Sequence, residues 1–215
     1  MVEAYRISIA NLAPRIMIKG TGAHHFIGIL NPTKYNREGK KLLQPLGGAA
    51  ELTDHGRRVL REDHEAADFA GNDARFLIQQ ASLEGVFRFF EHRNPGFVEL
   101  DVTREMREEL CERELNGIDP ILSAEEADQI EVVYARTVRQ PAAKATETSP
   151  SALKGIPTRR LFYLHDLWMP QAIFEKIIAS PAIQELSLAE LATTGGGSQG
   201  GTTVDSILLA DNIGV

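Results

Sequence analysis

Four glutamates lie close together in the sequence, in and just after the run REMREEL at residues 104–110. They are Glu105, Glu108, Glu109 and Glu112. On an α-helix these side chains would share one arc beside an apolar stripe. Each pair of like charges three or four residues apart costs about 0.2–0.5 kcal/mol, so a compensating positive charge is expected nearby.

Two kinds of positive charge would compensate this acidic arc. Arg104 is spaced to reach Glu108, and Arg113 is spaced to reach Glu109, which would give an ordinary salt-bridged helix. A hard divalent cation is the alternative, because Mg²⁺ prefers carboxylate oxygens and keeps coordination positions for water and substrate phosphate. The residues by themselves leave both interpretations open.

The composition bounds the class of protein. The chain has 215 residues, 43% of them hydrophobic, and a formal net charge of −7, so one acidic domain with one sizeable core is expected. Such a surface disfavours binding to a nucleic acid duplex or an anionic membrane. Cys111 is the sole cysteine, which excludes an intrachain disulfide and a thiolate metal site. Without a leader-like or membrane-spanning apolar run, we expect a cytoplasmic protein.

Periodicity predicts strands and helices mixed along the chain. The spacing of Val98, Val102, Met106 and Leu110 predicts the main helix at about 97–113. Further helices are expected at 82–93, 170–180, 188–194 and 202–212, and strands at 4–10, 14–20, 24–30, 42–50, 130–139 and 159–168.

Several signals mark where these elements start and stop. Capping-box spacings are present at Ser123 with Glu126 and at Ser187 with Glu190. The composition predicts a loop at about 141–158 and a flexible glycine-rich segment at 195–201. The mixture of strands and helices favours an α/β or α+β sandwich.

The run REMREEL resembles the core of the Nudix box, in which Arg-Glu is followed by an apolar residue, any residue and Glu-Glu. The pair Gly47-Gly48 after LLQP resembles the glycine pair that opens the box. This resemblance implies an α/β/α sandwich with a mixed sheet, formed by one domain over 1–215 and carrying its catalytic helix at about 97–113. An insertion at about 49–94 interrupts the box, an arrangement similar to SMODS-associated NUDIX domains, which are found beside nucleotide second-messenger synthases in bacterial conflict systems.

The resemblance also implies a role for each matched residue. Glu105, Glu108 and Glu109 would bind Mg²⁺ or Mn²⁺, and Arg104 would orient one of these glutamates by a salt bridge. Gly48 would lie near the metal through its backbone. The implied reaction is hydrolysis of a phosphoanhydride in a nucleoside diphosphate linked to another moiety, with Glu108 or Glu109 as the base.

One departure from the family pattern favours a different function. Gly96 stands where the first glutamate of the box is expected, which suits a Nudix-fold sensor that binds a nucleotide without cleaving it. A helical interaction domain with salt-bridged glutamates is a third interpretation. Retention of three clustered carboxylates favours the enzyme. Arg75 and Arg88, within the insertion, are candidates for binding the phosphates of a small-molecule nucleotide, and a homodimer would be in line with the family.

Overall fold

The computed structural model describes residues 4–35, 41–112, 120–143, 156–192, 202–204 and 213. The chain divides into two compact units. The first unit comprises Met1–Asn11, Gly48–Leu100 and Thr137–Tyr163, and the second comprises Leu12–Gly47, Asp101–Arg136 and Leu164–Val215. Each unit has a hydrophobic core of its own.

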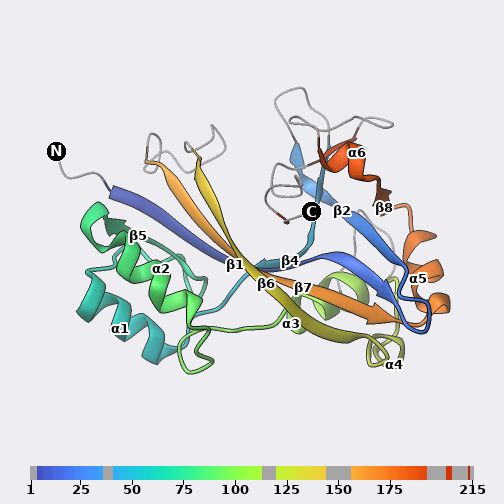
Figure 1. The fold of residues 1–215 in the computed structure, drawn as a ribbon, viewed down its shortest axis with the longest axis horizontal. Helices are drawn as coiled ribbons and strands as arrows, with labels where there is room; N and C mark the ends of the chain where they lie inside the picture. The colour runs from blue at the N-terminus through green and yellow to red at the C-terminus, as the bar shows by residue number, and fades with distance from the viewer. Residues whose placement is uncertain are drawn as a thin grey trace. The chain divides into compact units, whose positions relative to one another are not determined.

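Nine strands in the described part of the chain belong to one mixed sheet, and a mixed sheet is what the family resemblance implies. Strands hydrogen-bond in the order β6-β7-β1-β2-β3-β9, while β4 and β5 also pair with β1, and β8 pairs with β2. Strands β6, β7, β1 and β2 of this order are labelled in Figure 1. The β3–β9 pair is parallel, whereas β1–β2 and β2–β3 are antiparallel. The strand bounds are β1 Ala4–Ile18, β2 His24–Tyr35, β3 Lys41–Gln44, β4 Leu46–Ala49, β5 Arg75–Gln79, β6 Glu131–Ala143, β7 Thr158–Met169, β8 Ile183–Leu186 and β9 Thr202–Val204.

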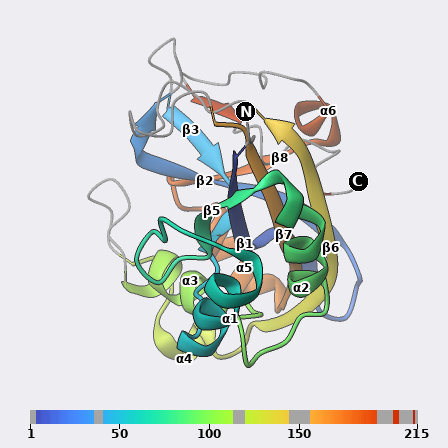
Figure 2. The ribbon, with the colours of Figure 1, turned by 90° about the vertical axis from the view of Figure 1, so that its left-hand side faces the viewer.

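The first unit packs two helices against the beginning of β1 and against β5. Alternate residues of β1, namely Tyr5, Ile7 and Ile9, face its core because successive strand residues point to opposite sides. Phe76 of β5 and Phe90 of α2 fill the same core. Figure 2 views this unit with its two helices toward the reader. The helices are α1 (Asp54–His64) and α2 (Leu83–Glu91), with the short 3₁₀ turn η1 (Gln80–Ser82) before α2.

The second unit packs helical segments against the end of β1 and against β2. Ile16 and Ile27 of these strands share a core with Met106, Leu110 and Phe174. Its helical segments are α3 (Thr103–Arg107), the π-helical turn η2 (Glu108–Glu112), α4 (Ala124–Ala127), α5 (Gln171–Ile178) and α6 (Leu188–Leu191). Among the described residues, no helix is long and apolar enough to cross a bilayer.

Most of the predicted elements are confirmed: α2, α5, β6, β7 and both capping boxes form as expected. The prediction of separate strands at 4–10 and 14–20 is wrong, because β1 runs unbroken from Ala4 to Ile18. Asn11, which lies between the two predicted strands, is buried and donates its side-chain amide to the carbonyl of Glu99 at 3.2 Å. The strand thus continues through Asn11 with the side-chain Nδ2 hydrogen-bonded, while the buried Oδ1 has no hydrogen-bond partner among the described residues.

The main helix is shorter than predicted. It begins at Thr103 rather than near 97, because the Asp101 carboxylate accepts the Thr103 N–H at 2.8 Å and starts the first turn there. Before it, Gly96 donates its N–H to the Asn94 side chain, which closes a turn. Val98 is buried in the core of the first unit instead of on this helix.

Two further predictions fail in the described residues. The stretch before α2, for which the sequence predicts neither a helix nor a strand, contains α1 and β5. Thr53 caps α1 by accepting the Gly56 N–H at 2.9 Å. Thr202–Val204 form β9 rather than the start of a last helix. Residues 205–212, the glycine-rich run 195–201 and residues 144–155 of the predicted loop lie outside the described residues.

The ion pairs of Arg139 give the first unit a pH-dependent stabilisation. The Arg139 guanidinium donates to both oxygens of Glu91 (2.5 and 2.8 Å), donates to Glu84 (3.0 Å) and lies over the Phe87 ring. The hydrogen bond from Arg139 lowers the pKa of Glu91. A carboxyl with a lowered folded-state pKa stabilises the fold above its unfolded-state pKa, and this contribution is lost as the pH falls through the folded-state value.

We therefore expect Arg139→Gln to lower the free energy of unfolding at pH 7 by about 1 kcal/mol. The difference from the wild type should shrink below about pH 4, where glutamates become protonated. Urea unfolding at pH 7 and at pH 3 measures both values. A difference that is the same at the two pH values would contradict this account.

Candidate functional site

The predicted metal-binding glutamates lie on the α3–η2 segment of the second unit. Met106 and Leu110, which lie four residues apart, are buried in the core and fix this segment on the sheet. The carbonyl of Leu110 accepts hydrogen bonds from the N–H groups of Ile121 (2.8 Å) and Leu122 (2.9 Å). These bonds tie the end of the π turn to the returning chain, so the carboxylates sit on an anchored element.

Arg104 holds two of the three predicted ligands. Its Nη2 donates to Oε1 of Glu105 at 2.7 Å, and its Nη1 donates to Oε1 of Glu108 at 2.9 Å. Glu105 is buried, with 5% of its surface exposed, whereas the Glu108 side chain is 48% exposed. Arginine therefore compensates part of the acidic arc, as one of the two interpretations of the sequence requires. The salt bridge also has the partners that the family resemblance implies.

The first glycine of the pair contacts the acidic segment within the second unit. Gly47 donates its N–H to Oε2 of Glu109 at 3.2 Å, although 62 positions separate the two residues in sequence. The φ of Gly47 is +125°, a backbone conformation that favours glycine. Gly48 is assigned to the first unit, and its predicted place near a metal stays a prediction.

The donor atoms suit a hard cation by their chemistry. The three glutamates offer only carboxylate oxygens, which Mg²⁺ and Mn²⁺ prefer to nitrogen or sulfur donors. Within the described residues, no group of three or more histidine, cysteine, aspartate or glutamate side chains is arranged to hold a metal ion. Bringing the three carboxylates onto one cation would therefore require a rotation of the side chains that Arg104 and Gly47 now bind.

Arg75 and Arg88, the predicted phosphate-binding residues, lie in the first unit. Nη1 of Arg75 lies 3.3 Å from Oδ2 of Asp73, so this guanidinium already has a carboxylate partner. Arg88 is exposed on α2, and its carbonyl accepts the N–H of His92 at 3.3 Å. Their role toward a substrate stays a prediction.

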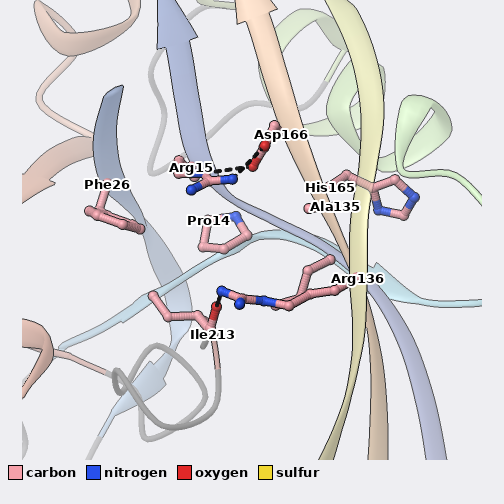
Figure 3. A pocket seen from close by; sticks show the side chains of 9 residues that line it. Pro14, Arg15, Phe26, Ala135, Arg136, His165, Asp166 and Ile213 are labelled. Atoms are coloured by element: carbon pink, nitrogen blue, oxygen red, sulfur yellow. Dashed lines mark hydrogen bonds and ion pairs between the residues drawn. The ribbon is translucent and has the colours of Figure 1, made fainter. Parts of the chain in front are cut away.

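A small cavity in the second unit was not foreseen from the sequence (Figure 3). Arg15 donates two hydrogen bonds to Asp166 (2.7 and 2.6 Å), which raise the pKa of Arg15, and Arg136 donates to the carbonyl of Ile213 at 2.8 Å. The cavity has room for about one water molecule, about 20 Å³. Arg15 and Asp166 are 151 positions apart, so no local motif could reveal the pair. The lining residues are Pro14, Arg15, Phe26, Ala135, Arg136, Leu164, His165, Asp166 and Ile213.

The one cysteine does not act as a nucleophile in this arrangement. Partial burial raises the pKa of the Cys111 thiol, and its Sγ lies 3.8 Å from the Ser123 carbonyl oxygen. A thiol with a raised pKa is protonated at neutral pH and reacts poorly. The chemistry of the segment therefore rests on its carboxylates.

Comparison with known proteins gives one family match. The model of the SMODS-associated NUDIX domain matches residues 4–189, which is most of the chain. A search of curated proteins and a search of solved structures each found no match. The match agrees with the resemblance seen in the REMREEL run and the glycine pair.

The Arg104 pair yields a prediction about stability. Arg104→Gln removes the cation beside the buried Glu105, so the free energy of unfolding at pH 7 should fall by about 1–3 kcal/mol. Arg107→Gln is the matched control on the same helix, because Arg107 pairs with the exposed Asp128. That variant should cost less than about 1 kcal/mol. Urea unfolding measures both, and equal losses in the two variants would contradict the structural role of Arg104.

Proposed function

We propose, on the premise that this chain belongs to the family of SMODS-associated NUDIX domains, that it is a hydrolase dependent on a divalent cation. Its substrate would be a nucleoside diphosphate linked to another moiety, cleaved at the phosphoanhydride. The observation that supports the proposal best is the hydrogen bond from Gly47 to Glu109. It joins the glycine pair to the acidic segment despite the long insertion between them.

Glu105, Glu108 and Glu109 are the residues that would hold Mg²⁺ or Mn²⁺. When bound, the cation would neutralise charge on the pyrophosphate and lower the pKa of a water molecule. The local positive field would also reconcile an anionic substrate with a chain whose net charge is −7. Met106 and Leu110, which are buried in the core, would keep the segment that carries the carboxylates in place.

The base is best assigned to Glu108. Its Oε1 accepts from Arg104, while its Oε2 makes no hydrogen bond within the described residues and half of the side chain is exposed. A solvent-accessible carboxylate oxygen can take the proton of an attacking water. Arg104 would act as a positioning residue, because it orients Glu105 and Glu108 together.

A nucleotide sensor with the same fold is the second candidate. Gly96 replaces the first glutamate of the box, and Arg104 already compensates two of the remaining carboxylates. Both features reduce the negative charge available to a metal, which weakens cation binding. A sensor would bind a nucleotide and leave it intact.

The proposal predicts that Glu108→Gln/Glu109→Gln binds Mn²⁺ at least about 10-fold more weakly than the wild type, because two oxygen-ligand charges are lost. A matched variant, Glu62→Gln/Glu65→Gln, removes the same charge from exposed positions of the first unit and should bind Mn²⁺ like the wild type. Isothermal titration calorimetry measures both affinities. Equal binding by all three proteins would rule out the metal centre.

Hydrolysis separates the two candidate functions. Release of the nucleoside monophosphate should be followed by chromatography, with Mg²⁺ and ADP-ribose, dinucleoside polyphosphates or nucleotide sugars as substrates and with the control variant beside the wild type. A hydrolase should lose about 100-fold or more of its rate in Glu108→Gln, as expected when a general base is removed. Metal binding without hydrolysis of any of these compounds would favour the sensor.

A further inference from the structure

Helix α1 of the first unit carries three arginines that have no carboxylate partner among the described residues. Arg57, Arg58 and Arg61 make no ion pair with any residue in the described part of the chain, although acidic residues such as Glu62 and Glu65 are close in sequence. The chain has 30 acidic residues against 23 lysines and arginines, so uncompensated arginines are unexpected here. Ordinary surface pairing therefore does not account for this face of α1.

Two of these arginines converge on one aromatic ring. The guanidinium carbons of Arg57 and Arg61 lie 5.8 Å and 5.0 Å from the centroid of the Phe69 ring. The two arginines are four residues apart, which places them on the same side of the helix. A ring face attracts each cation but carries no net charge, so the pair of positive charges remains uncompensated.

The Phe69 ring, which contacts both arginines, is itself fixed by packing against the core. Phe69 stacks on Phe76 with the ring centroids 5.3 Å apart, and Phe76 is buried in the core of the first unit. Ala67 and Leu77 exchange two backbone hydrogen bonds of 2.9 and 2.8 Å, which fasten the segment before Phe69 to β5. The aromatic base of the cluster is therefore positioned before any ligand arrives.

One hydrogen bond orients the Arg57 guanidinium, and its Nε has no acceptor among the described residues. Its Nη2 donates to Oδ1 of Asn72 at 2.9 Å, which fixes the guanidinium plane. Its Nε is buried and has no hydrogen-bond partner among the described residues. Arg61 is exposed to solvent, so its donors remain open to an incoming group.

We infer that Arg57, Arg61 and Phe69 form a binding site for an oligophosphate group, separate from the glutamates of α3–η2. Guanidinium groups match phosphate oxygens with two parallel hydrogen bonds, and two neighbouring guanidiniums suit two linked phosphates. Such a site needs no divalent cation, because the arginines supply the positive charge. The inference does not rest on the proposed function, since none of its residues belongs to the glutamate segment.

The test is calorimetric titration of inorganic pyrophosphate into the full chain in the presence of EDTA, which removes divalent cations. Arg57→Gln/Arg61→Gln should bind pyrophosphate at least about 10-fold more weakly, and Arg61→Gln alone about 5-fold more weakly. Arg58→Gln removes the same charge from the same helix, but Arg58 contacts His55 instead of Phe69. This control should change the affinity by less than about 2-fold.

Two results would overturn the site: unchanged binding by the double variant, or an equal loss in Arg58→Gln and Arg61→Gln, which would indicate general charge attraction only. Thermal unfolding checks that each variant is folded. Phe69→Leu keeps an apolar contact toward Phe76 but removes the ring, and an intermediate loss is expected. Glu108→Gln/Glu109→Gln should bind pyrophosphate like the wild type, which separates this site from the proposed metal centre.

Three probes in the same buffer distinguish a small phosphorylated ligand from a nucleic acid backbone. ADP should bind at least as tightly as pyrophosphate, and adenosine should not bind, because it lacks the phosphates. A single-stranded oligonucleotide should bind no better than ADP. Tighter binding of the oligonucleotide that increases with its length would overturn the assignment to a small phosphorylated ligand and indicate a nucleic acid backbone instead.

Discussion

The buried carboxylate of Glu105 is the constraint on which the second unit depends. A carboxylate held away from water needs a nearby positive charge, because desolvation costs several kcal/mol without one, of the order found for buried ions. Arg104 supplies that charge and extends it to Glu108. Met106 and Leu110 of the same segment are buried in the core. Their packing fixes the rotation of the segment about its axis and therefore the direction in which the glutamates point. The charge arrangement and the hydrophobic core thus specify one orientation of α3–η2.

The long insertion is tolerated because its two ends lie side by side. Leu52 and Val98 form an isolated antiparallel bridge, and Glu99 donates its N–H to the carbonyl of Glu51 at 2.8 Å. The chain therefore leaves and returns at neighbouring positions. Between these points the insertion contributes β5, α1 and α2 to a core built with the first part of β1. An inserted segment with its own packing does not have to distort the elements that flank it.

Sequence patterns predicted those elements whose signals are local. The capping box at Ser123 fixed the start of α4, and the apolar spacing around Phe87 predicted α2. The start of the main helix was missed because the stripe from Val98 to Leu110 is continuous in sequence yet divided between two cores. Periodicity reports that a residue is buried but not which core buries it. The family resemblance identified the glycine pair and the glutamates but did not predict the hydrogen bond from Gly47 to Glu109. The geometry around Phe69 depends on tertiary packing alone.

The two charged clusters differ in how their charges are compensated, and this difference bears on function. Around Glu105 the protein provides its own counter-charge, because Arg104 bonds to Glu105 and Glu108. The acidic segment therefore needs no metal to be folded, and a cation would have to compete with Arg104. Around Phe69 the described residues provide none, and the arginines are left with a neutral ring and one amide. A ligand phosphate would therefore gain more at the arginines, since no existing ion pair has to be broken first. Recognition of an anion by the insertion is thus independent of whether the glutamates support hydrolysis or only binding.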